Sequence, residues 1–458
     1  MSEATTAISI PQLRADLHGR VTAPGAPGYD EGRTVFYGGI DRRPAAIVRA
    51  GDADDVSRVI ALARETGAEL AVRSGGHSIA GHSATEGGIV LDLRDLDGLE
   101  IDVEGRTAWV GGGVNTGRYT KAAAEHGLAT PFGDTGSVGI GGLTLGGGVG
   151  YLVRKHGLTI DDLLAAEVVT ADGQLVRADA ESHPDLFWAI RGGGGNFGVA
   201  TRLQLRLHEL RGVVGGMLIL PATADTVYGF MAEAEAAPEE LSAIANVMPA
   251  PPMPFLPAEQ HGRPVIFAVL VYAGEGEAGE RAVAPFRALA EPIADTLGPK
   301  RYPEIFMPGG DEEFHPVGSS RTMYVDSIDR SAAQTIVEQL GASTAMMAAV
   351  QLRVLGGAAA RVPVDATAYA HRRSRIMVNV AALFGSRDET PVHEPWVTGL
   401  ADMLRHDDHG AYVNFLDDEG EERIRAAYPG PTWDRLVEIK RRYDPTNLFR
   451  LNQNIPPG

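Results

Sequence analysis

The chain has 458 residues, which is too long for a single ordinary domain, and this length predicts two domains. Hydrophobic residues make up 44% and charged residues 22%, which excludes the disordered and fibrous classes. The net charge of −19 argues against nucleic acid as a partner, because an acidic surface repels phosphate backbones. The absence of Cys excludes disulfides, thiolate metal sites, iron–sulfur clusters and Cys nucleophiles.

The N-terminal residues lack the basic start and the apolar run of a signal peptide. The chain also has no apolar stretch long enough to span a bilayer. These two features predict a soluble, cytoplasmic protein with no membrane partner. The sequence does not indicate an oligomeric state.

Predicted strands and helices alternate in the first part of the chain. Apolar runs at 45–50, 69–73 and 88–93 predict three short strands. Asp52 is placed to cap a helix that ends at Gly67, since apolar residues recur between them at helical spacing.

Two hairpins are predicted further along. Residues 99–103 and 107–110 alternate around Glu104-Gly105, and residues 165–177 repeat this design around Asp172-Gly173. The remaining predictions for this part are helices at 115–126 and 183–190 and a half-buried strand at 199–210.

The composition changes after about residue 210, where glycine clusters become rarer and longer amphipathic segments appear. The predicted elements are helices at 276–290 and 330–340 and strands near 264–273, 348–355 and 374–384. This mixture predicts an α+β domain with an antiparallel sheet. After residue 410 we expect a strand at 412–415, two helices and a tail rich in Asn and Pro.

The first glycine cluster, Arg73–Gly81, directly follows a predicted strand. Gly75 and Gly76 allow positive φ, so successive N–H groups can point into one concavity and bind an anion such as a pyrophosphate. His77 lies in this turn, and its imidazole is either a nucleophile, base or ligand, or an ordinary surface side chain.

The second cluster, Gly133–Gly150, contains nine glycines in eighteen residues. Such a run is not expected inside a regular strand or helix. It either wraps closely around a ligand or is a flexible linker. Apolar residues such as Val138 and Leu145 favour a packed segment, because linkers are usually polar.

Other motifs are set aside. Residues 193–198 match G-x-G-x-x-G, but a predicted strand follows where a dinucleotide-binding motif needs a helix. The signatures of α/β-hydrolases and of P-loop proteins are absent. His77 with His82, or His406 with His409, could ligate a metal. An acid-rich solvated loop is the simpler interpretation of the second pair, and no metal site is predicted.

Taken in order, these segments resemble the FAD-linked oxidases of the vanillyl-alcohol oxidase superfamily, and within it the berberine-bridge-enzyme-like group. Arg73–Ser78 resembles the family's flavin-attachment loop, and Gly141–Leu163 resembles its second flavin loop. Asp185–Gly198 and Tyr443–Ile455 match its later signatures. The resemblance covers nearly the whole chain.

The resemblance implies an α+β fold in which a split PCMH-type FAD-binding domain encloses a substrate domain with an antiparallel sheet. The FAD-binding domain would take residues 1–210, with its PCMH-type core at about 41–210. The substrate domain would take residues 211–410, and residues 411–458 would return to the flavin.

The resemblance also implies FAD as the cofactor, bonded covalently through His77. The other expected flavin contacts are Arg73, Ser74, Gly75, Gly76, Ser78, Gly81, His82, Thr135, Gly136, Val138, Gly141, Gly142, Thr144, Gly147, Gly150, Tyr151, Gly198, Val199, Asn414 and Asn452.

Three features depart from the family pattern. Thr135 stands where many members bond the flavin a second time through Cys, so a single link through His77 is expected. Phe415 takes the usual place of a base tyrosine. Gln351 and Arg353 stand where nicotine-oxidizing relatives carry Lys and Glu, so that amine chemistry is in question.

Catalytic candidates therefore come first from the predicted strand at 349–355. Side chains alternate along a strand, so Gln351 and Arg353 share one face, which by resemblance looks across the substrate at the flavin. Arg353 would there bind a carboxylate or an oxyanion, or else sit in an ordinary ion pair with an acid. Tyr412 and Tyr369 are the next candidates, because a perturbed phenol can ionise.

The function implied is an oxidase: a small alcohol, sugar, amine or secondary metabolite gives a hydride to FAD, and O2 reoxidises the flavin to give H2O2. A small Val at position 138 is typical of relatives that react with O2. One alternative is a flavin enzyme that oxygenates or cyclises a biosynthetic intermediate. Another alternative is a catalytically inactive flavin-binding protein, because Phe415 stands where the family usually has a base tyrosine.

Overall fold

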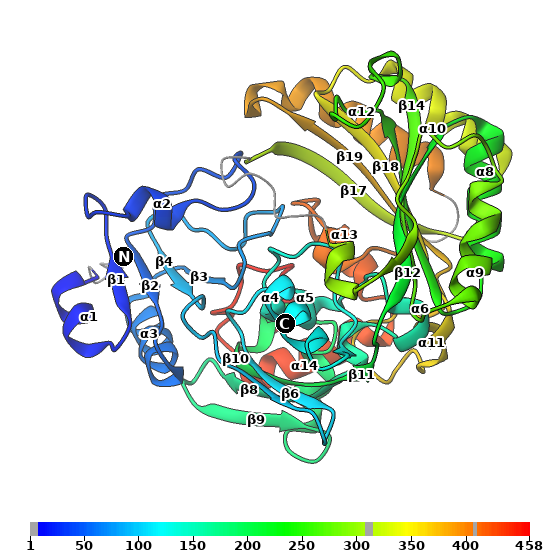
Figure 1. The fold of residues 1–458 in the computed structure, drawn as a ribbon. Helices are drawn as coiled ribbons and strands as arrows, with labels where there is room; N and C mark the ends of the chain where they lie inside the picture. Colours follow the sequence, from blue (N-terminus) through cyan, green and yellow to red (C-terminus); the bar gives the residue numbers. More distant parts are fainter. Residues whose placement is uncertain (1–7, 307–314, 406–409) are drawn as a thin grey trace.

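The computed structural model describes residues 8–306, 315–405 and 410–458. Figure 1 shows a lower lobe, with two small sheets and the last helices of the chain, and an upper lobe built on one large sheet. Residues 406–409, considered above as metal ligands, lie outside the described residues. Within the described residues, no helix combines the length and the apolar character that a bilayer span needs.

The first sheet of the lower lobe has the order β1-β2-β4-β3. Its strands are β1 (Arg20–Thr22), β2 (Ala46–Arg49), β3 (Leu70–Arg73) and β4 (Ile89–Asp92). The last three match the three predicted apolar strands, and they pair in parallel. The surrounding helices are α1 (Ile10–Asp16), α2 (Tyr29–Arg33) and α3 (Ala53–Thr66).

Helix α3 forms where its end signals predict it. The carboxylate of Asp52 accepts the backbone N–H of Asp55, and Gly67 ends the helix in the left-handed conformation, with φ of 67°. Its apolar face is buried against the first sheet through Val56, Val59, Ile60 and Ala63. The predicted helix is confirmed.

The second sheet is antiparallel, with the order β5-β6-β10-β8-β9. Its strands are β5 (Leu99–Asp102), β6 (Thr107–Gly111), β8 (Leu163–Val169), β9 (Leu175–Asp179) and β10 (Val199–Arg206). Both predicted hairpins are confirmed, and β10 joins them, because Leu203 pairs with Val110 on one side and Ala166 on the other. A two-stranded pair, β7 (Leu128–Ala129) and β11 (His208–Glu209), lies beside this sheet.

Helices surround the second sheet. They are α4 (Thr116–Ala124), α5 (Ile140–Gly146), α6 (Val153–His156), α7 (Pro184–Ala189), α13 (Glu421–Ala427) and α14 (Pro431–Tyr443). Helix α14 packs on α7 through a shared apolar cluster that includes Leu186 and Leu436. The C-terminal segment therefore packs in the lower lobe.

The upper lobe is one sheet of eight strands, in the order β15-β12-β14-β13-β18-β19-β17, with β16 beside β12. Its strands are β12 (Val213–Pro221), β13 (Leu241–Pro249), β14 (Pro264–Tyr272), β15 (Ala294–Asp295), β16 (Gly298–Lys300), β17 (Val317–Val325), β18 (Met347–Val354) and β19 (Ile376–Phe384). All pairs in this sheet are antiparallel, as predicted.

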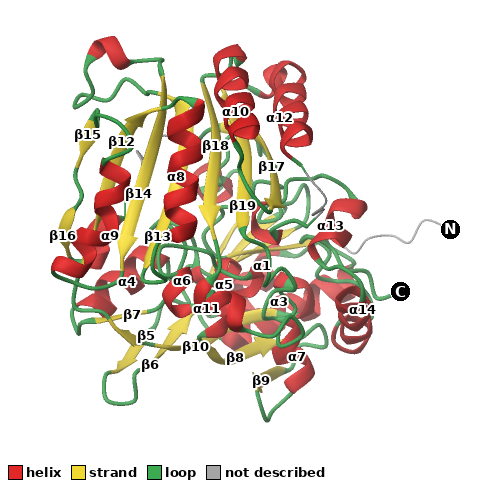
Figure 2. Cartoon of the chain, turned by 90° about the vertical axis from the view of Figure 1, so that its right-hand side faces the viewer, coloured by secondary structure: helices red, strands yellow, loops and turns green. Residues whose placement is uncertain are grey.

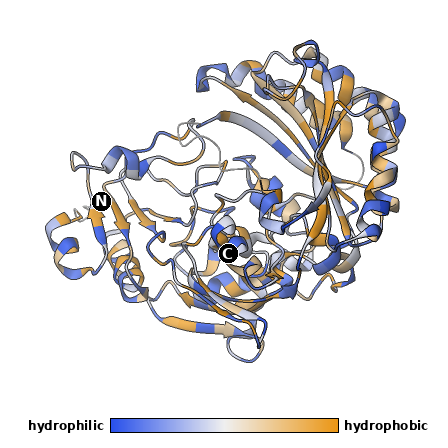
Figure 3. Ribbon diagram, in the orientation of Figure 1, coloured by the Kyte–Doolittle hydropathy of each residue, from blue (hydrophilic) through white to orange (hydrophobic). Residues whose placement is uncertain are grey.

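Four helices cover the outer face of this sheet (Figure 2), namely α8 (Ala224–Ala236), α9 (Glu277–Arg287), α10 (Arg330–Ala342) and α12 (Thr390–Leu404). In Figure 3 these helices alternate hydrophobic and hydrophilic residues, because only one side of each meets the sheet. The other face of the sheet turns toward the lower lobe. A helix α11 (Gly357–Arg361) and short 3₁₀ turns at Thr159–Asp161, Gly194–Phe197, Ala258–Gln260, Tyr302–Ile305, Arg387–Glu389 and Val413–Phe415 complete the fold.

Buried arginines join the lobes. Arg154 of α6 donates to the carbonyl oxygens of Ala234, Ala237 and Leu241, at the end of α8 and the start of β13. Arg372 donates to both carboxylate oxygens of Asp161 at 2.8 Å. Each guanidinium meets several oxygens in a fixed geometry, which ties the two lobes together.

Two expectations about the chain are wrong. The predicted strand at 412–415 is a 3₁₀ turn, because Asn414 turns its side chain to Leu143 instead of joining a sheet. Part of the glycine-rich run forms helix α5, although glycine disfavours a helix interior. Burial of Ile140 and Leu145 and close packing against neighbouring chain stabilise this helix.

Candidate active site

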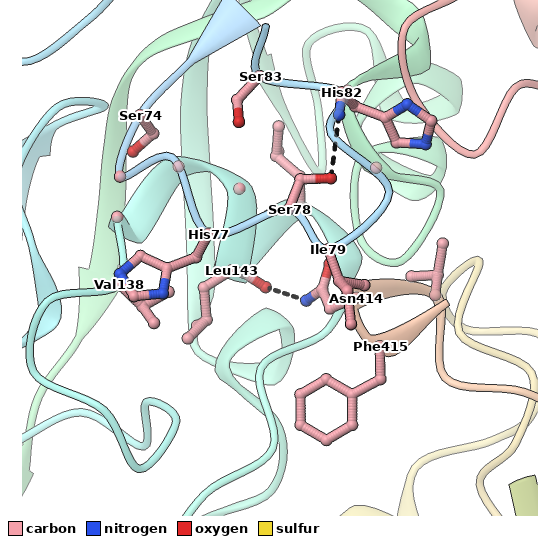
Figure 4. Close-up of a pocket in the computed structure, with 18 of the residues that line it drawn as sticks. Ser74, His77, Ser78, Ile79, His82, Ser83, Val138, Leu143, Asn414 and Phe415 are labelled. Atoms are coloured by element: carbon pink, nitrogen blue, oxygen red, sulfur yellow. Dashed lines mark hydrogen bonds between the residues drawn. The ribbon is translucent and has the colours of Figure 1, made fainter. Parts of the chain in front are cut away.

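A cavity of about 480 Å³ lies between the lobes. Its walls come from the loop after β3, the glycine-rich run, three strands of the upper sheet and the C-terminal segment. Figure 4 shows this convergence, with His77 and Val138 on one side and Asn414 and Phe415 on another. Four parts of the chain that are distant in sequence thus form one site.

The loop after β3 approaches the second glycine cluster backbone to backbone. A Cβ atom on Gly75 would collide with the backbone of Gly139, and Gly76 has φ of 73°. The hydroxyl of Ser74 donates to the carbonyl oxygen of Gly112 at 2.6 Å. These contacts hold the turn that carries His77.

The imidazole of His77 stacks on Phe36, with ring centroids 4.3 Å apart. Its Nε2 atom lies 3.1 Å from the hydroxyl of Ser137. Burial lowers the pKa of His77 to about 4, so the ring is neutral at pH 7. A neutral, oriented imidazole that faces a cavity can act as a nucleophile.

Asn414 joins the C-terminal segment to the glycine-rich run. Its Nδ2 atom donates to the carbonyl oxygen of Leu143 at 3.0 Å (Figure 4) and to the hydroxyl oxygen of Tyr412 at 3.0 Å. The same phenol oxygen accepts the N–H of Gly148 at 2.8 Å. Burial raises the pKa of Tyr412, although Asn414 and Gly148 oppose this effect.

The upper sheet contributes a row of polar side chains. The register places Asn246, Gln351 and Asn379 side by side on neighbouring strands, on the face opposite the helices. The amide nitrogen of Gln351 donates to Asn246 Oδ1 at 2.8 Å. Asn379 Oδ1 is buried and has no hydrogen-bond partner among the described residues. Gln351 and Asn379 both line the cavity.

Arg353 is engaged on several sides. It donates to Gln351 Oε1 from Nε at 2.8 Å and from Nη2 at 2.6 Å, to Asp134 Oδ2 at 2.5 Å and to the carbonyl oxygen of Val149 at 3.2 Å. Its guanidinium lies over the ring of Phe415, 5.2 Å from the centroid. Of the two roles expected for Arg353, the structure shows the ion pair.

Most expected flavin contacts line the cavity. These are Ser74, Gly75, Gly76, His77, Ser78, His82, Thr135, Val138, Gly141, Gly142, Gly198, Val199, Asn414 and Asn452. The expected residues that do not line it are Arg73, Gly81, Gly136, Thr144, Gly147, Gly150 and Tyr151.

Arg73 shows why some expected contacts lie elsewhere. Its guanidinium is buried in an ion pair with Asp92 at 2.7 Å, so it fastens the end of β3 to β4. Among the catalytic candidates, Gln351, Arg353 and Tyr412 line the cavity, whereas Tyr369 does not. The Tyr369 hydroxyl is instead 2.8 Å from the hydroxyl of Tyr324.

Sequence reasoning missed several lining residues. Asp134 stands alone as an acid within the glycine-rich run, and that isolation was the available signal. Ser320 and Asn379 carry no local signal, because only the register of β17 and β19 brings them to the cavity. Phe36 and Tyr37 come from a loop for which no element was predicted.

The cavity fits the FAD that the resemblance implies. Its glycine-rich walls leave room that side chains would fill, as at Gly75 and Gly139. Ser83 Oγ and His82 Nε2 line the cavity, are buried and have no hydrogen-bond partner among the described residues. Buried polar atoms of this kind need a partner, which the polar atoms of a dinucleotide can supply.

Comparisons with known proteins agree with this interpretation. Two family profiles match, described as "FAD binding domain" at residues 44–179 and "Berberine and berberine like" at residues 411–456. (R)-6-Hydroxynicotine oxidase from Paenarthrobacter nicotinovorans is 30% identical, with 96% of this chain and 97% of that protein covered. The uncharacterized FAD-linked oxidoreductase YvdP from Bacillus subtilis (strain 168) is 31% identical, with 96% and 99% covered.

A solved structure shows the same fold over nearly the full length. The crystal structure of 6-hydroxy-D-nicotine oxidase from Arthrobacter nicotinovorans matches with a TM-score of 0.85 and 28% identity, over 96% of this chain and 98% of that one. Fold, cavity and sequence similarity thus lead to one assignment. The chain belongs to the berberine-bridge-enzyme-like family of FAD-linked oxidoreductases, with the α+β, PCMH-type fold of that family.

Proposed function

We propose that this FAD oxidoreductase is an oxidase that takes a hydride from a small organic substrate and passes the electrons to O2, with H2O2 as product. The substrate class comprises alcohols, sugars, amines and secondary metabolites. The observation that supports the proposal is the cavity, in which a glycine-rich cradle faces a row of polar side chains. Such a site can hold a flavin and a substrate face to face.

His77 is the residue proposed to hold FAD covalently. Its ring is neutral, stacked on Phe36 and placed beside the Ser137 hydroxyl, so a lone pair is available to form the bond. Ser74, Gly75, Thr135, Val138, Asn414 and the other predicted residues that line the cavity would surround the cofactor. When bound, FAD supplies the two-electron acceptor.

The domain division follows the lobes. We assign the FAD-binding domain to residues 1–210 and 411–458, with its PCMH-type core at about 41–210, and the substrate domain to residues 211–410. The second small sheet ends at β10, and the large sheet begins at β12, which supports a boundary near residue 210.

The substrate would meet neutral polar groups on the upper sheet. Arg353 uses four of its five N–H groups on Gln351, Asp134 and Val149, so a carboxylate clamp would require those bonds to break. One amide hydrogen of Gln351 and the side-chain carbonyl oxygen of Asn379 remain available to hydrogen-bond a substrate. Phe415 can only wall the site, because it has no titratable group.

The test begins with the absorption spectrum of the purified protein. A panel that contains benzyl alcohol, D-glucose, benzylamine, coniferyl alcohol and 6-hydroxynicotine is then mixed with it anaerobically. Bleaching of the flavin by any member supports an active enzyme, and one H2O2 per substrate in air supports an oxidase. Label from ¹⁸O2 in the organic product would instead support the oxygenating alternative. A flavin that no member of a widened panel reduces supports the inactive flavin-binding protein.

A further inference from the structure

The cavity wall contains one ion pair. Among its described lining residues, Asp134 is the only carboxylic acid, and Arg353 is the only Arg or Lys. Asp134 comes from the glycine-rich run of the lower lobe, and Arg353 comes from β18 of the upper lobe. Their side chains meet at 2.5 Å, and the hydroxyl of Thr135 donates to Asp134 Oδ1 at 3.1 Å.

Removal of a hydride from an alcohol or an amine also requires a group that takes the O–H or N–H proton. Most other titratable groups of the cavity are poorly suited to this task. His77 and His82 are both assigned to the flavin, so neither ring is placed to take a proton from the substrate. Burial raises the pKa of Tyr37 to about 12.

Tyr412 is held in a different way. Its oxygen already accepts two N–H bonds, from Gly148 and from Asn414, and its ring is buried. A substrate proton would have to reach an oxygen whose acceptor positions are occupied. Phe415, at the end of the same turn, has no titratable group, so the described lining residues leave Asp134 as the available carboxylate.

We propose that Asp134 is the catalytic residue that accepts the substrate proton, and that Arg353 positions its carboxylate. This inference rests on the proposed function. The substrate O–H or N–H bond breaks, its proton goes to Asp134, and its electron pair becomes the second bond of the product carbonyl or imine. The C–H bond on the carbon that carries this O or N also breaks, and bound FAD would supply the two-electron acceptor for its hydride. Atoms and charge balance without another reagent.

The position of Asp134 supports this role. Its side chain lines the cavity and is about 23% exposed, so the carboxylate is not sealed inside the protein. Arg353 and Thr135 hold one oxygen each, which fixes the direction of the carboxylate and leaves further acceptor positions toward the cavity. Gln351 fixes Arg353 in turn through two bonds to its Oε1 atom.

The competing explanation is that Asp134 only balances the charge of Arg353. Both residues would then matter equally, because removing either one breaks the same pair. The variants Asp134→Asn, Asp134→Glu and Arg353→Met and the double variant Asp134→Asn/Arg353→Met separate the two explanations. The double variant also avoids a buried, unpaired guanidinium, so it remains informative if Asp134→Asn folds poorly.

The first measurement is anaerobic flavin reduction by the fastest-reducing member of the substrate panel. We expect Asp134→Asn and the double variant to be slower by about 10²–10⁴-fold, and Arg353→Met to be slower by less than about tenfold. Asp134→Glu should recover part of the rate. Equal losses for Asp134→Asn and Arg353→Met, or a loss of only a few-fold for the double variant, would overturn the proposal.

The second measurement is binding of sulfite, an anion that adds to the flavin and can be followed by absorbance without turnover. Loss of a negative charge close to the reacting face should tighten the sulfite Kd by about tenfold in Asp134→Asn, and loss of Arg353 should weaken it. A Kd that changes less than twofold in Asp134→Asn would place the carboxylate away from the flavin and overturn the proposal.

Failure of the two proposals can be told apart. If the unmutated protein contains no flavin, or if no substrate reduces it, the proposed function fails. Suppose instead that a substrate reduces the unmutated protein and that all variants retain their flavin. If Asp134→Asn and Arg353→Met then lose the same factor in flavin reduction rate, only the role of Asp134 fails. Flavin content and thermal unfolding of each variant are therefore recorded first.

Discussion

Asn414 and Gly146 lie so close together that the amide oxygen of Asn414 fills the place where a side chain on Gly146 would begin. The amide nitrogen of Asn414 donates to Leu143 and to Tyr412. A single side chain of the C-terminal segment thus fastens the glycine-rich helix α5 to the cavity wall.

The variant Gly146→Ala tests this packing. A methyl group would push Asn414 away and break both of its hydrogen bonds, so we expect a loss of about 1–3 kcal/mol in the free energy of unfolding and a lower flavin content. Urea unfolding and the flavin absorbance measure these effects. Gly399→Ala in α12 is the control, because a Cβ atom there meets nothing within 4 Å, and Ala favours a helix. A Gly146→Ala variant as stable and as yellow as its parent would contradict the packing argument.

The covalent bond is expected at one position, His77. Acid precipitation of the unmutated protein should leave a yellow pellet, and His77→Ala should leave a colourless one, because Cys is absent and cannot form a second link. His82→Ala is the matched control, since His82 also lines the cavity and burial also lowers its pKa to about 4. Its pellet should stay yellow. Release of the colour from the unmutated protein into the supernatant would refute the bond.

Val138 is expected to control access of O2 to the reduced flavin. It lines the cavity between Thr135 and Gly139, and an added methylene can close a narrow path in a packed site. We expect Val138→Ile to slow reoxidation by at least about tenfold, while anaerobic reduction stays within a few-fold of the parent. Stopped-flow absorbance resolves the two half-reactions. Reoxidation of the unmutated enzyme over many minutes in air would show that O2 is not its acceptor.

Gln351 is expected to contribute in the transition state. Gln351→Leu removes the acceptor that Arg353 uses twice and the amide hydrogen that remains for substrate. We expect flavin reduction to slow by about 10²–10³-fold with flavin content unchanged. Gln334→Leu on the exposed side of α10 is the control. A reduction rate within a few-fold of the parent would remove Gln351 from the mechanism.

The pH dependence of stability has one expected source at His156, which is not among the residues that line the cavity. Burial, with smaller contributions from His208 and Lys155, lowers the pKa of His156 to about 3, and its ring stacks on His208 at 4.0 Å. In the unfolded chain this imidazole binds a proton near pH 6.5, whereas in the folded protein it stays neutral until about pH 3. Because the unfolded state binds more protons, the free energy of unfolding decreases as the pH falls from about 6.5 toward 3.

His156→Gln should remove that effect. We expect the free energy of unfolding lost between pH 7 and pH 5 to shrink by about 1 kcal/mol, a value reduced for the partial exposure of the ring. Denaturant unfolding at the two pH values measures it. The variant His126→Gln, at an exposed position, should behave like the parent. An unchanged loss in His156→Gln would show that the ring titrates as it does in the unfolded chain.

The sequence predicted those elements whose signals are local. Asp52 and Gly67 mark both ends of α3, and Gly173 adopts the positive φ of 86° that its hairpin turn requires. These signals act within a few residues of the structure they determine. The same holds for the loop around His77, where adjacent glycines set the backbone.

The elements that failed depend on distant contacts. Residues 412–415 were expected to form a strand, yet Asn414 bonds to Leu143, 271 residues away. The partner of Arg353 is Asp134, 219 residues away, and the sequence offered many acids for that place. Asn379 reaches the cavity only through the register of β19 with β18. Such pairings follow from the assembled fold and have no local signal.

The cavity wall contains residues as far apart as Phe36 and Gln453. A chain still being synthesised has the His77 loop but not Asn452 and Gln453, which close the site from the other end of the sequence. A complete cavity wall therefore requires that the chain has been synthesised at least as far as Gln453. The yellow colour of a preparation would then report finished, correctly folded molecules, and a chain truncated before residue 451 should accumulate colourless even with His77 intact.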